Sequence, residues 1–309
     1  MSDGGPDGRV PAGDRSSARK NSPELGSPDR SSIDRDSFNP LPVDVVSIQS
    51  QVVYGCVGNT VAVPTMQALG LNVISLPTVL LSNVPHYDTL HGGPVSTAWF
   101  EGFLADVERR RVLESARAIL LGYLGPPEQT AVLVAWLERV LASHPQIQLL
   151  LDPVIGDHDV GIYVHAELPG LLRERLVPMS HGLTPNSFEL EQLVGKRLTT
   201  LDETIAAARQ LLSSTTEWIV VTSAAPAETS AGETSVLIVT ADDTRVITHR
   251  LVETVAKGAG DLFTASLVGR LLLGDSLYEA AQFACDKTEA VMTHTTELGC
   301  AELVLNQRR

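Results

Sequence analysis

Short runs of aliphatic and β-branched residues alternate with helical patterns through most of this chain, and this alternation restricts its fold more than any other feature. The strand-like runs occupy residues 43–50, 72–81, 117–125 and 147–154. The apolar spacings typical of helices occupy residues 58–69, 95–110 and 128–143. Neighbouring parallel strands need long crossover connections, which helices supply. We therefore predict an α/β fold, with a central, mostly parallel β-sheet and helices on both faces.

The second half of the chain continues this pattern and adds a hairpin. A strand is predicted at residues 217–223, and residues 235–250 resemble two antiparallel strands that turn at Asp242–Asp243. The predicted helices occupy residues 187–194, 202–213, 259–273 and 276–293. In open α/β sheets, ligands bind at the carboxyl ends of the strands. The residues of a functional site are therefore expected in the loops that follow the strands.

The first 40 residues differ from the rest of the chain. They are rich in Ser, Gly, Pro and mixed charge and show no apolar period of a strand or a helix. Such a segment buries too little apolar surface to offset its ordering entropy, so residues 1–40 are predicted to be a disordered tail. The alternative is a segment that folds on a partner. Residues 41–309 are predicted to form a single α/β domain.

The composition excludes several classes of partner. The 309 residues include 23 Lys and Arg against 37 Asp and Glu, a net charge of −14, which disfavours nucleic acid as a ligand. No stretch reaches the roughly 18 consecutive apolar residues of a membrane span, and the polar N-terminus lacks a signal core. A cytoplasmic protein is therefore expected. Cys56, Cys285 and Cys300 are too widely spaced to predict a disulfide framework or a zinc site.

The strongest local motif is the sequence KGAGD at residues 257–261, which opens a predicted helix. Glycines before a helix leave its backbone N–H groups and its positive end open to an anion. A carboxylate in the first turn, here Asp261, is held beside that anion and can take a proton from an attacking hydroxyl group. A helix end with flanking turn glycines explains the motif equally well. Its glycine spacing is neither that of a Walker A loop nor that of a dinucleotide fingerprint.

Two further motifs place carboxylates after predicted strands. Asn186 is a good helix cap, and Glu189 three residues later completes a capping box. Glu189 also lies where a hydrated Mg²⁺ bound to phosphates would sit. Asp152 follows the very apolar run IQLLL, and a buried acid needs a partner such as Mg²⁺ or a phosphate-bound water. Capping of a helix or a turn remains the alternative for both acids.

Together with motifs in the N-terminal half, these three resemble the pyridoxal kinases of the ribokinase superfamily. The N-terminal motifs are SIQSQVVYG at 47–55, VGN at 57–59, PTVLLSN at 77–83, HYDT at 86–89 and GYLG at 122–125. The resemblance runs from about residue 43 to the last predicted helix. It implies ATP-dependent phosphorylation of the 5′-hydroxymethyl group of pyridoxal, pyridoxine and pyridoxamine. It also implies Mg²⁺, a monovalent cation as a further candidate, and a homodimer.

The resemblance assigns roles to individual residues. Asp261 is implied as the catalytic base, beside an anion hole formed by the backbone of residues 258–260. The residues implied to bind the vitamin are Ser50, His86, Tyr123 and Asp261. Those implied to bind ATP are Asp152, Tyr163, Thr184, Asn186, Thr222, Ser223, Lys257, Gly258 and Gly260. Those implied at the metal are Asp152, Tyr163 and Glu189. Taken singly, Ser50, His86 and Tyr123 are also explained by a strand-end turn, a solvated loop and the core. A solvated loop explains Lys257 as well as a phosphate contact does.

Two departures from the family pattern concern residues 257–261, called the anion loop below, and the residues just before it. Relatives often have threonine where this chain has Ala259, a change that leaves a backbone anion hole intact. Relatives also often carry an acid two positions before the lysine, where residues 253–256 read ETVA, so the cation environment is expected to differ.

Three alternatives stay open at this stage. A hydroxymethylpyrimidine kinase of thiamin salvage shares the anion loop and a similar flat substrate, but the motifs at 50–55 and 86–89 disfavour it. A non-catalytic vitamin-binding or regulatory protein is disfavoured by the intact Asp261 and its glycines. A doubly wound oxidoreductase is disfavoured because no strand is followed by the dinucleotide glycine fingerprint.

Overall fold

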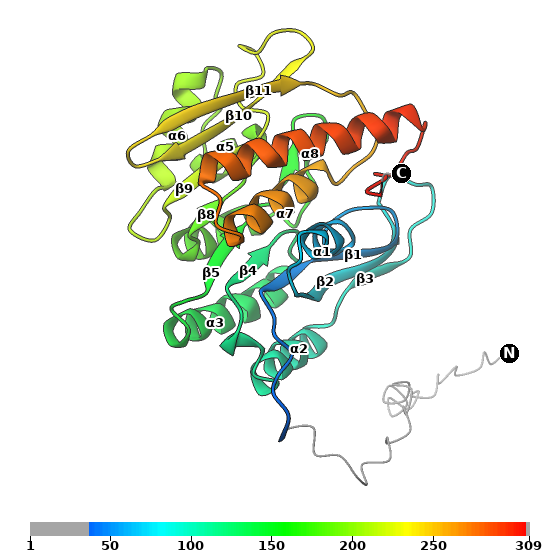
Figure 1. Ribbon diagram of the computed structural model, residues 1–309, viewed down its shortest axis with the longest axis vertical. Helices are drawn as coiled ribbons and strands as arrows, with labels where there is room; N and C mark the ends of the chain where they lie inside the picture. The colour runs from blue at the N-terminus through cyan, green and yellow to red at the C-terminus, as the bar shows by residue number, and fades with distance from the viewer. Residues whose placement is uncertain (1–36, 307–309) are drawn as a thin grey trace, which may run out of the picture. The chain divides into compact units, whose positions relative to one another are not determined.

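The computed structural model describes residues 37–306, and it contains the predicted α/β architecture (Figure 1). From Pro40 onward the chain forms one compact unit. The tail predicted for residues 1–40 lies almost entirely outside the described residues, so it stays a prediction. The strands are β1 Val45–Tyr54, β2 Val73–Asn83, β3 Gly92–Pro94, β4 Ala118–Leu121, β5 Gln148–Leu151, β6 Gly156–Asp157, β7 Gly161–Ile162, β8 Gly182–Leu183, β9 Trp218–Val221, β10 Glu233–Thr240 and β11 Thr244–Arg250. The α-helices are α1 Asn59–Ala68, α2 Thr97–Arg109, α3 Pro127–Ser143, α4 Leu168–Leu171, α5 Ser187–Val194, α6 Leu201–Leu211, α7 Ala259–Leu272 and α8 Leu277–Glu297.

Across the described residues, the main sheet has nine strands in the order β11-β10-β9-β8-β5-β4-β1-β2-β3. The six strands from β9 to β2 pair in parallel, and β3, β10 and β11 extend the two edges antiparallel. The predicted mostly parallel sheet is therefore confirmed. The hairpin of β10 and β11 turns at Asp242–Asp243 as expected, closed by a hydrogen bond of 2.9 Å from Thr240 N–H to Asp243 O.

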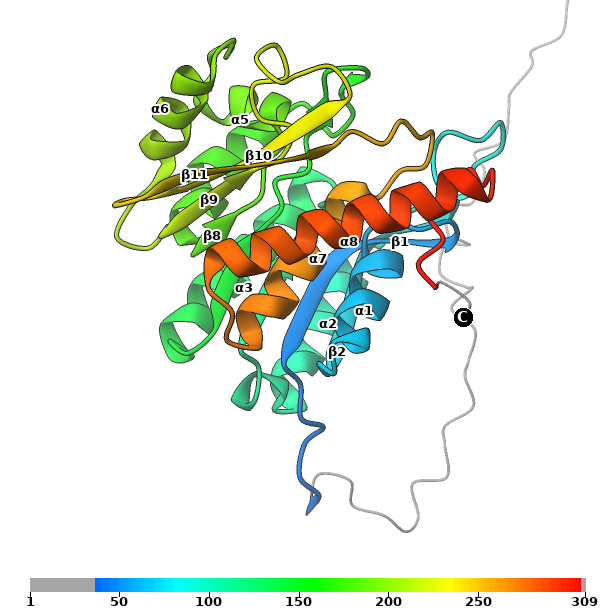
Figure 2. The ribbon, with the colours of Figure 1, turned by 45° about the horizontal axis from the view of Figure 1, so that its top comes forward.

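Side chains of the central strands alternate between two helical layers. Ile119 and Leu121 of β4 join a buried cluster with residues of α2, α3, α5 and α6, whereas Ala118 and Leu120 face α1 and α7. Helix α8 packs on α7 and on the β10–β11 hairpin. Figures 1 and 2 show α1, α7 and α8 on one side of the sheet, with α2 and α3 on the other. Because both faces are buried, the central strands consist of continuous apolar runs.

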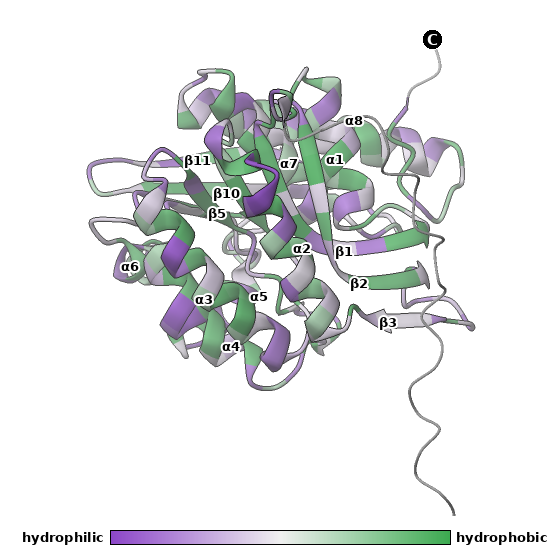
Figure 3. Ribbon diagram, turned by 90° about the horizontal axis from the view of Figure 1, so that it is seen from below, coloured by the Kyte–Doolittle hydropathy of each residue, from purple (hydrophilic) through white to green (hydrophobic). Residues whose placement is uncertain are grey.

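One hydrophilic stretch interrupts this apolar pattern in β1. Figure 3 shows it between two hydrophobic ends of the strand. The sequence there is SIQSQ at residues 47–51, in which Ile48 is the only apolar residue. Ser47, Gln49 and Ser50 are nevertheless buried. Buried polar side chains in a central strand need hydrogen-bond partners or a ligand, so this level of the sheet is a candidate for a site.

Four of the eight α-helices in residues 37–306 begin with a side-chain cap, but α7 is not among them. The N-cap residues of α2, α5, α6 and α8 each accept a hydrogen bond from the backbone N–H three residues on: Ser96, Asn186, Thr200 and Ser276. Helix α7 begins after Gly258 without a side-chain cap. Its first N–H groups are therefore available to another acceptor.

Several short elements were not predicted. They are β3, the two-stranded sheet of β6 and β7, and three consecutive short helical elements. Those three elements are α4, the π-helical turn η3 Leu172–Leu176 and the 3₁₀ turn η4 Val177–Met179. The 3₁₀ turn η2 Val112–Glu114 was also missed. Elements of two to five residues carry too little periodicity to be recognised in a sequence. In the part of the chain described here, no helix combines the length and apolarity needed to cross a membrane.

Candidate active site

The amino end of α7 presents an open helix terminus held in place by a glycine. Gly258 has a φ of +98°, a left-handed conformation that favours glycine, and a Cβ there would collide with the backbone oxygen of Cys56. At Gly260, in contrast, an added Cβ would meet nothing within 4 Å. The uncapped N–H groups and the positive end of the helix dipole therefore border open space at Gly260, an arrangement that suits an anion.

Asp261 lies in the first turn of α7 and is partly buried. Loss of solvation raises the pKa of its carboxyl group to about 6, and a hydrogen bond donated by the Gly58 N–H opposes this shift. Asp261 is thus mostly ionised at neutral pH. It is also a better proton acceptor than an ordinary aspartate, as a general base requires.

Gly58 connects Asp261 to the hydrophilic stretch of β1. It has a φ of +53°, and a Cβ there would collide with the side chain and backbone of Ser50. Ser50 is buried and lies where the pairing of β1 with β2 shifts register, so that it faces both Thr78 and Val79. Irregularities of this β-bulge type re-aim side chains and are frequent beside active sites.

Ser50 and Tyr123 lie at one level of the sheet. The pairing of β1 with β4 ends at Ile48 and Leu121, and Ser50 and Tyr123 each follow that pair by two residues at the same end of the sheet. Thr78 Oγ1 donates to Tyr123 O at 2.7 Å, and partial burial raises the pKa of the Tyr123 phenol.

His86 lies apart from these residues. It is exposed in the loop between β2 and β3, where Asn83 Nδ2 donates to the backbone oxygens of Val84 and Thr89. Among the contacts described for residues 37–306, none joins the His86 side chain to Ser50, Tyr123 or Asp261. The structure therefore brings together two of the three residues expected around the vitamin ring.

Asp152 is buried at the end of β5 and is linked to α7. Thr264 Oγ1 donates to Asp152 Oδ2 at 3.2 Å, and the hydroxyl groups of Thr264 and Thr184 lie 2.8 Å apart. Burial first, and then the negative charges of Glu189 and Asp261, raise the pKa of Asp152 well above its ordinary value. The acids predicted at separate strand ends therefore share one electrostatic environment.

Glu189 forms the predicted capping box and reaches the loop after β5 as well. Its Oε2 accepts from Asn186 N–H at 2.8 Å and its Oε1 accepts from Ile155 N–H at 3.0 Å, while Asn186 Oδ1 accepts from Glu189 N–H. Burial raises the pKa of Glu189 to about 7 against the lowering effect of these backbone donors. The same side chain thus caps α5 and holds the segment that leads to Tyr163.

The pair Asp152 and Glu189 has the chemistry of a site for hydrated Mg²⁺. Both carboxyl groups are buried, and within residues 37–306 neither forms an ion pair with Lys, Arg or His. In the same part of the chain, no three His, Cys, Asp or Glu side chains gather closely enough to enclose a metal. Mg²⁺ usually keeps several waters and takes one or two carboxylates, so these two acids fit it.

The β6–β7 hairpin and Tyr163, which follows it, lie close to the acids and to the anion loop. Burial, then the charges of Glu189, Asp152 and Asp261, raise the pKa of the Tyr163 phenol. Lys257 Nζ lies 3.8 Å from Asp157 Oδ2 in this hairpin. Lys257 thus ties the anion loop to the segment that carries Tyr163.

The remaining residues expected around ATP follow β8 and β9. Asn186 and Thr222 form an isolated parallel bridge, and Thr222 N–H donates to Pro185 O at 2.9 Å. Ser223 and Ala225 have φ values of +48° and +43°, which are strained for residues with a Cβ. Strained loops of this kind occur at ligand sites.

Comparisons with known proteins agree with this geometry. A family model described as phosphomethylpyrimidine kinase matches residues 112–306. A pyridoxine/pyridoxal/pyridoxamine kinase of Bordetella bronchiseptica is 50% identical over 266 residues, which cover 86% of this chain and 94% of that protein. The chain belongs to the pyridoxal kinase family. The family resemblance predicted from the sequence is confirmed, and the protein is a kinase.

Solved structures of pyridoxal kinases have the same fold as this kinase. The Entamoeba histolytica enzyme matches with a TM-score of 0.79 at 22% identity, covering 86% of this chain and 93% of that one. The Leishmania donovani enzyme in complex with ADP and pyridoxine matches with a TM-score of 0.75 at 25% identity, covering 85% and 90%. The predicted ribokinase-like fold is therefore confirmed.

Three residues of the site in this kinase were not predicted from the sequence. Thr264 links Asp152 to Thr184, Gly58 donates to Asp261, and Thr78 holds Tyr123. Thr264 follows Asp261 by three positions, so helical spacing would have placed both on one face. Gly58 and Thr78 lie in the motifs VGN and PTVLLSN, but those motifs did not predict their contacts, which depend on the strands and loops that lie beside them.

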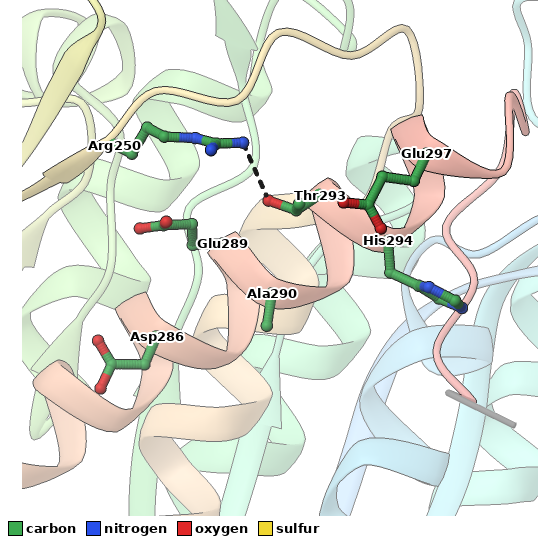
Figure 4. Close-up of a pocket in the computed structure, with 7 residues that line it drawn as sticks. All are labelled: Arg250, Asp286, Glu289, Ala290, Thr293, His294 and Glu297. Carbon is green, nitrogen blue, oxygen red and sulfur yellow. Dashed lines mark hydrogen bonds between the residues drawn. The ribbon is translucent and has the colours of Figure 1, made fainter. Parts of the chain in front are cut away.

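A concavity of ≈ 660 Å³ along α8 lies outside this set of residues (Figure 4). It is lined by Arg250, Asp286, Glu289, Ala290, Thr293, His294 and Glu297. Arg250 is engaged with Thr293 Oγ1 at 3.4 Å, and three carboxylates outnumber the basic side chains. The concavity is therefore poorly suited to a phosphate, and none of the predicted site residues lines it.

Proposed function

We propose that this kinase transfers the γ-phosphoryl group of ATP to the 5′-hydroxymethyl group of pyridoxal, pyridoxine and pyridoxamine. The observation that carries the proposal is Asp261, a carboxylate with a pKa of about 6 held by Gly58 beside the uncapped end of α7. The Bordetella relative is named for these three vitamers, and the Leishmania structure contains ADP and pyridoxine. Both support this choice of substrates.

In this mechanism Asp261 is the general base. It accepts the proton of the 5′-hydroxyl group as the oxygen forms a bond to the γ-phosphorus, and the bond from that phosphorus to the β,γ-bridging oxygen breaks to release ADP. Backbone N–H groups of residues 258–260 donate to the oxygens of the transferring phosphoryl group. Preorganised donors of this kind stabilise charge where it develops in the transition state.

Asp152 and Glu189 would hold Mg²⁺ through bound water, with Tyr163 beside them. Bound Mg²⁺ neutralises charge on the phosphate groups. Asp152, Thr184, Asn186, Thr222, Ser223 and Lys257 surround the nucleotide phosphates in this proposal. The ETVA segment at residues 253–256 is the expected place for a difference in monovalent-cation binding; Thr254 Oγ1 accepts there from Ala256 N–H at 3.1 Å.

Ser50, Tyr123 and His86 hold the vitamin in this proposal. The proximity of Ser50 to Gly58, and of Gly58 to Asp261, supports a ring bound at the level of Ser50 with its hydroxymethyl group toward the base. Exposed His86 would have to approach the ring by movement of its loop, as loops that cover active sites do.

Glu189→Gln tests the metal assignment. We expect a higher Mg²⁺ requirement with a nearly unchanged KM for pyridoxal, because a lost charge weakens cation binding and leaves the vitamin pocket alone. Glu279→Gln is the matched control, since Glu279 forms the same capping box with Ser276 on α8. A loss of pyridoxal affinity without a change in Mg²⁺ dependence would show that Glu189 acts only as a cap.

The second candidate function is phosphorylation of hydroxymethylpyrimidine, which the description of the family model favours. That model starts at residue 112, so it leaves out Ser50 and His86, whereas the Bordetella relative covers 86% of the chain. The deciding experiment measures kcat/KM with Mg–ATP for the three vitamers and for hydroxymethylpyrimidine. A higher value for hydroxymethylpyrimidine would replace the proposed substrates, and tight vitamin binding without turnover would indicate a regulatory protein.

A homodimer and a cytoplasmic location complete the proposal. Large apolar side chains are exposed at the end of β1 and on α2, among them Val53 (79% exposed), Tyr54 (61%) and Trp99 (63%). Exposed apolar side chains that gather into a patch are typical of protein interfaces, so these residues are the candidates for a dimer contact. Sedimentation velocity at micromolar concentration tests the dimer, and a monomer would contradict it.

A further inference from the structure

The C-terminal segment, residues 300–306, folds back against the loop between β1 and α1. Figures 1 and 2 show it beside that loop and the loop that follows β2. Glu302 Oε2 accepts a hydrogen bond of 3.2 Å from the backbone N–H of Cys56, 246 residues earlier in the chain. A Cβ on Gly55, whose φ is +106°, would lie only 2.6 Å from Glu302 Oε2 and 2.8 Å from Val84. Glycine at position 55 therefore permits the carboxylate to approach.

The same carboxylate contacts the loop that carries His86. The Tyr87 hydroxyl group donates a hydrogen bond to Glu302, which raises the pKa of Tyr87 to about 12. The Tyr87 ring also packs edge-on against Tyr54 at the end of β1, with ring centroids 5.9 Å apart. Glu302 thus accepts one hydrogen bond from each of two loops, and both donors are uncharged.

The loop that Glu302 holds is also the loop that positions the proposed base. The Cys56 carbonyl packs against Gly258 of the anion loop, and the Gly58 N–H donates to Asp261. Cys56 and Gly58, on either side of Val57, therefore both contact residues 258–261.

Leu303 supports the anion loop from behind. It is 3% exposed and packs in a cluster with Ala256 and Leu262, which flank residues 257–261 on both sides. Val304 N–H donates to Thr295 Oγ1 at 3.0 Å, which fixes the segment to α8. The segment that presents Glu302 is thus anchored at the site independently of the Glu302 side chain.

We propose that Glu302 is a positioning residue of this kinase, which holds residues 55–58 against the anion loop and joins them to the loop carrying His86. The carboxylate has both of its donors only when both loops are in place. The placement of the loop carrying His86 and the placement of Asp261 are therefore coupled through the Glu302 side chain. This role rests on the proposed function, and Glu302 itself touches no substrate.

Glu302→Ala tests the role. We expect kcat/KM for pyridoxal to fall at least about tenfold, since small misplacements of reacting groups have effects up to about 10²-fold, while KM for ATP stays within about twofold. The apparent pKa of Asp261 in the pH profile should rise, because the opposing Gly58 hydrogen bond is weakened. Glu302→Gln, which keeps an acceptor for the Cys56 N–H, should lose less. Exposed Glu297→Ala is the matched control at the end of α8.

A second readout is independent of turnover. Amide hydrogen exchange of a peptide containing residues 55–58 should speed up in Glu302→Ala and remain near the wild-type rate in Glu302→Gln and Glu297→Ala. Wild-type protein that phosphorylates no vitamer would overturn the proposed function, while this exchange pattern would still support the holding of the loop by Glu302. Unchanged exchange together with kcat/KM within about twofold of wild type would overturn the positioning role.

Tyr87→Phe keeps the test decisive if Glu302→Ala does not fold. It removes only the hydroxyl group of a partly exposed side chain, so folding should persist. We expect a higher KM for pyridoxal and an effect that does not add to that of Glu302→Gln, because the two side chains act through one hydrogen bond. Two results would contradict the coupling between Glu302 and the loop carrying His86. One is full additivity of the Tyr87→Phe and Glu302→Gln effects, and the other is wild-type kinetics in Tyr87→Phe.

Discussion

Two influences act on the Asp261 carboxyl group in opposite directions, and the chemistry of the site depends on their balance. Burial raises its pKa, and the Gly58 N–H lowers it, leaving a value of about 6. Asp261→Asn is nearly isosteric and removes proton acceptance, so we expect kcat to fall by about 10² to 10⁴ with little change in KM for ATP. Steady-state kinetics with a thermal melt as folding control measures this. Near wild-type turnover in a folded variant would leave the anion loop as the main catalytic device.

The same pKa predicts opposite pH dependences for activity and stability. kcat/KM should fall as pH drops below about 6, because the base becomes protonated. The folded-state pKa exceeds the ordinary value of 3.8, so the Asp261 contribution to stability is present at acid pH and is lost as pH rises through about 6. Melting temperatures and kcat/KM measured across this range check both signs. Asp261→Asn should flatten part of the stability slope, and an unchanged slope would contradict the raised pKa.

At the level of structural elements, the two glycines at the start of α7 have different reasons for being glycine. Gly258 is fixed by its φ and by the Cys56 backbone, whereas Gly260 borders open space. Gly258→Ala should therefore lower the melting temperature, with a strain of about 1–3 kcal/mol. Gly260→Ala should melt like wild type, yet lose turnover because its methyl group occupies the space left for the phosphoryl group. Thermal melts and kcat for both variants measure the contrast, and an active Gly260→Ala protein would show that this space is not used.

For the molecule as a whole, the N-terminal 40 residues offer a test of the predicted domain boundary. Their composition lacks the apolar content to join a core, and the compact unit begins at Pro40. Deletion of residues 1–40 should leave the melting temperature and kcat nearly unchanged. Calorimetry and kinetics of the truncated protein check this; a clear drop in either would show that the segment belongs to the folded kinase.

The sequence by itself determined the layers of the fold and most of its helices and strands, because apolar periodicity and capping are local properties. The capping box of Asn186 and Glu189 and the turn at Asp242–Asp243 are examples, since their hydrogen bonds join residues three apart. The resemblance carried by short motifs supplied the expected site residues. Short elements such as β3, β6 and β7 escaped because a few residues contain no period.

Only the tertiary structure decided how those residues meet. The hydrogen bond from Thr264 to Asp152 joins residues 112 positions apart, and that from Cys56 to Glu302 joins residues 246 apart. The order of strands in the sheet and the shift of register at Ser50 set which loops become neighbours. Such contacts depend on packing between elements that are remote in the chain, and no local pattern of residues records which remote element will lie alongside.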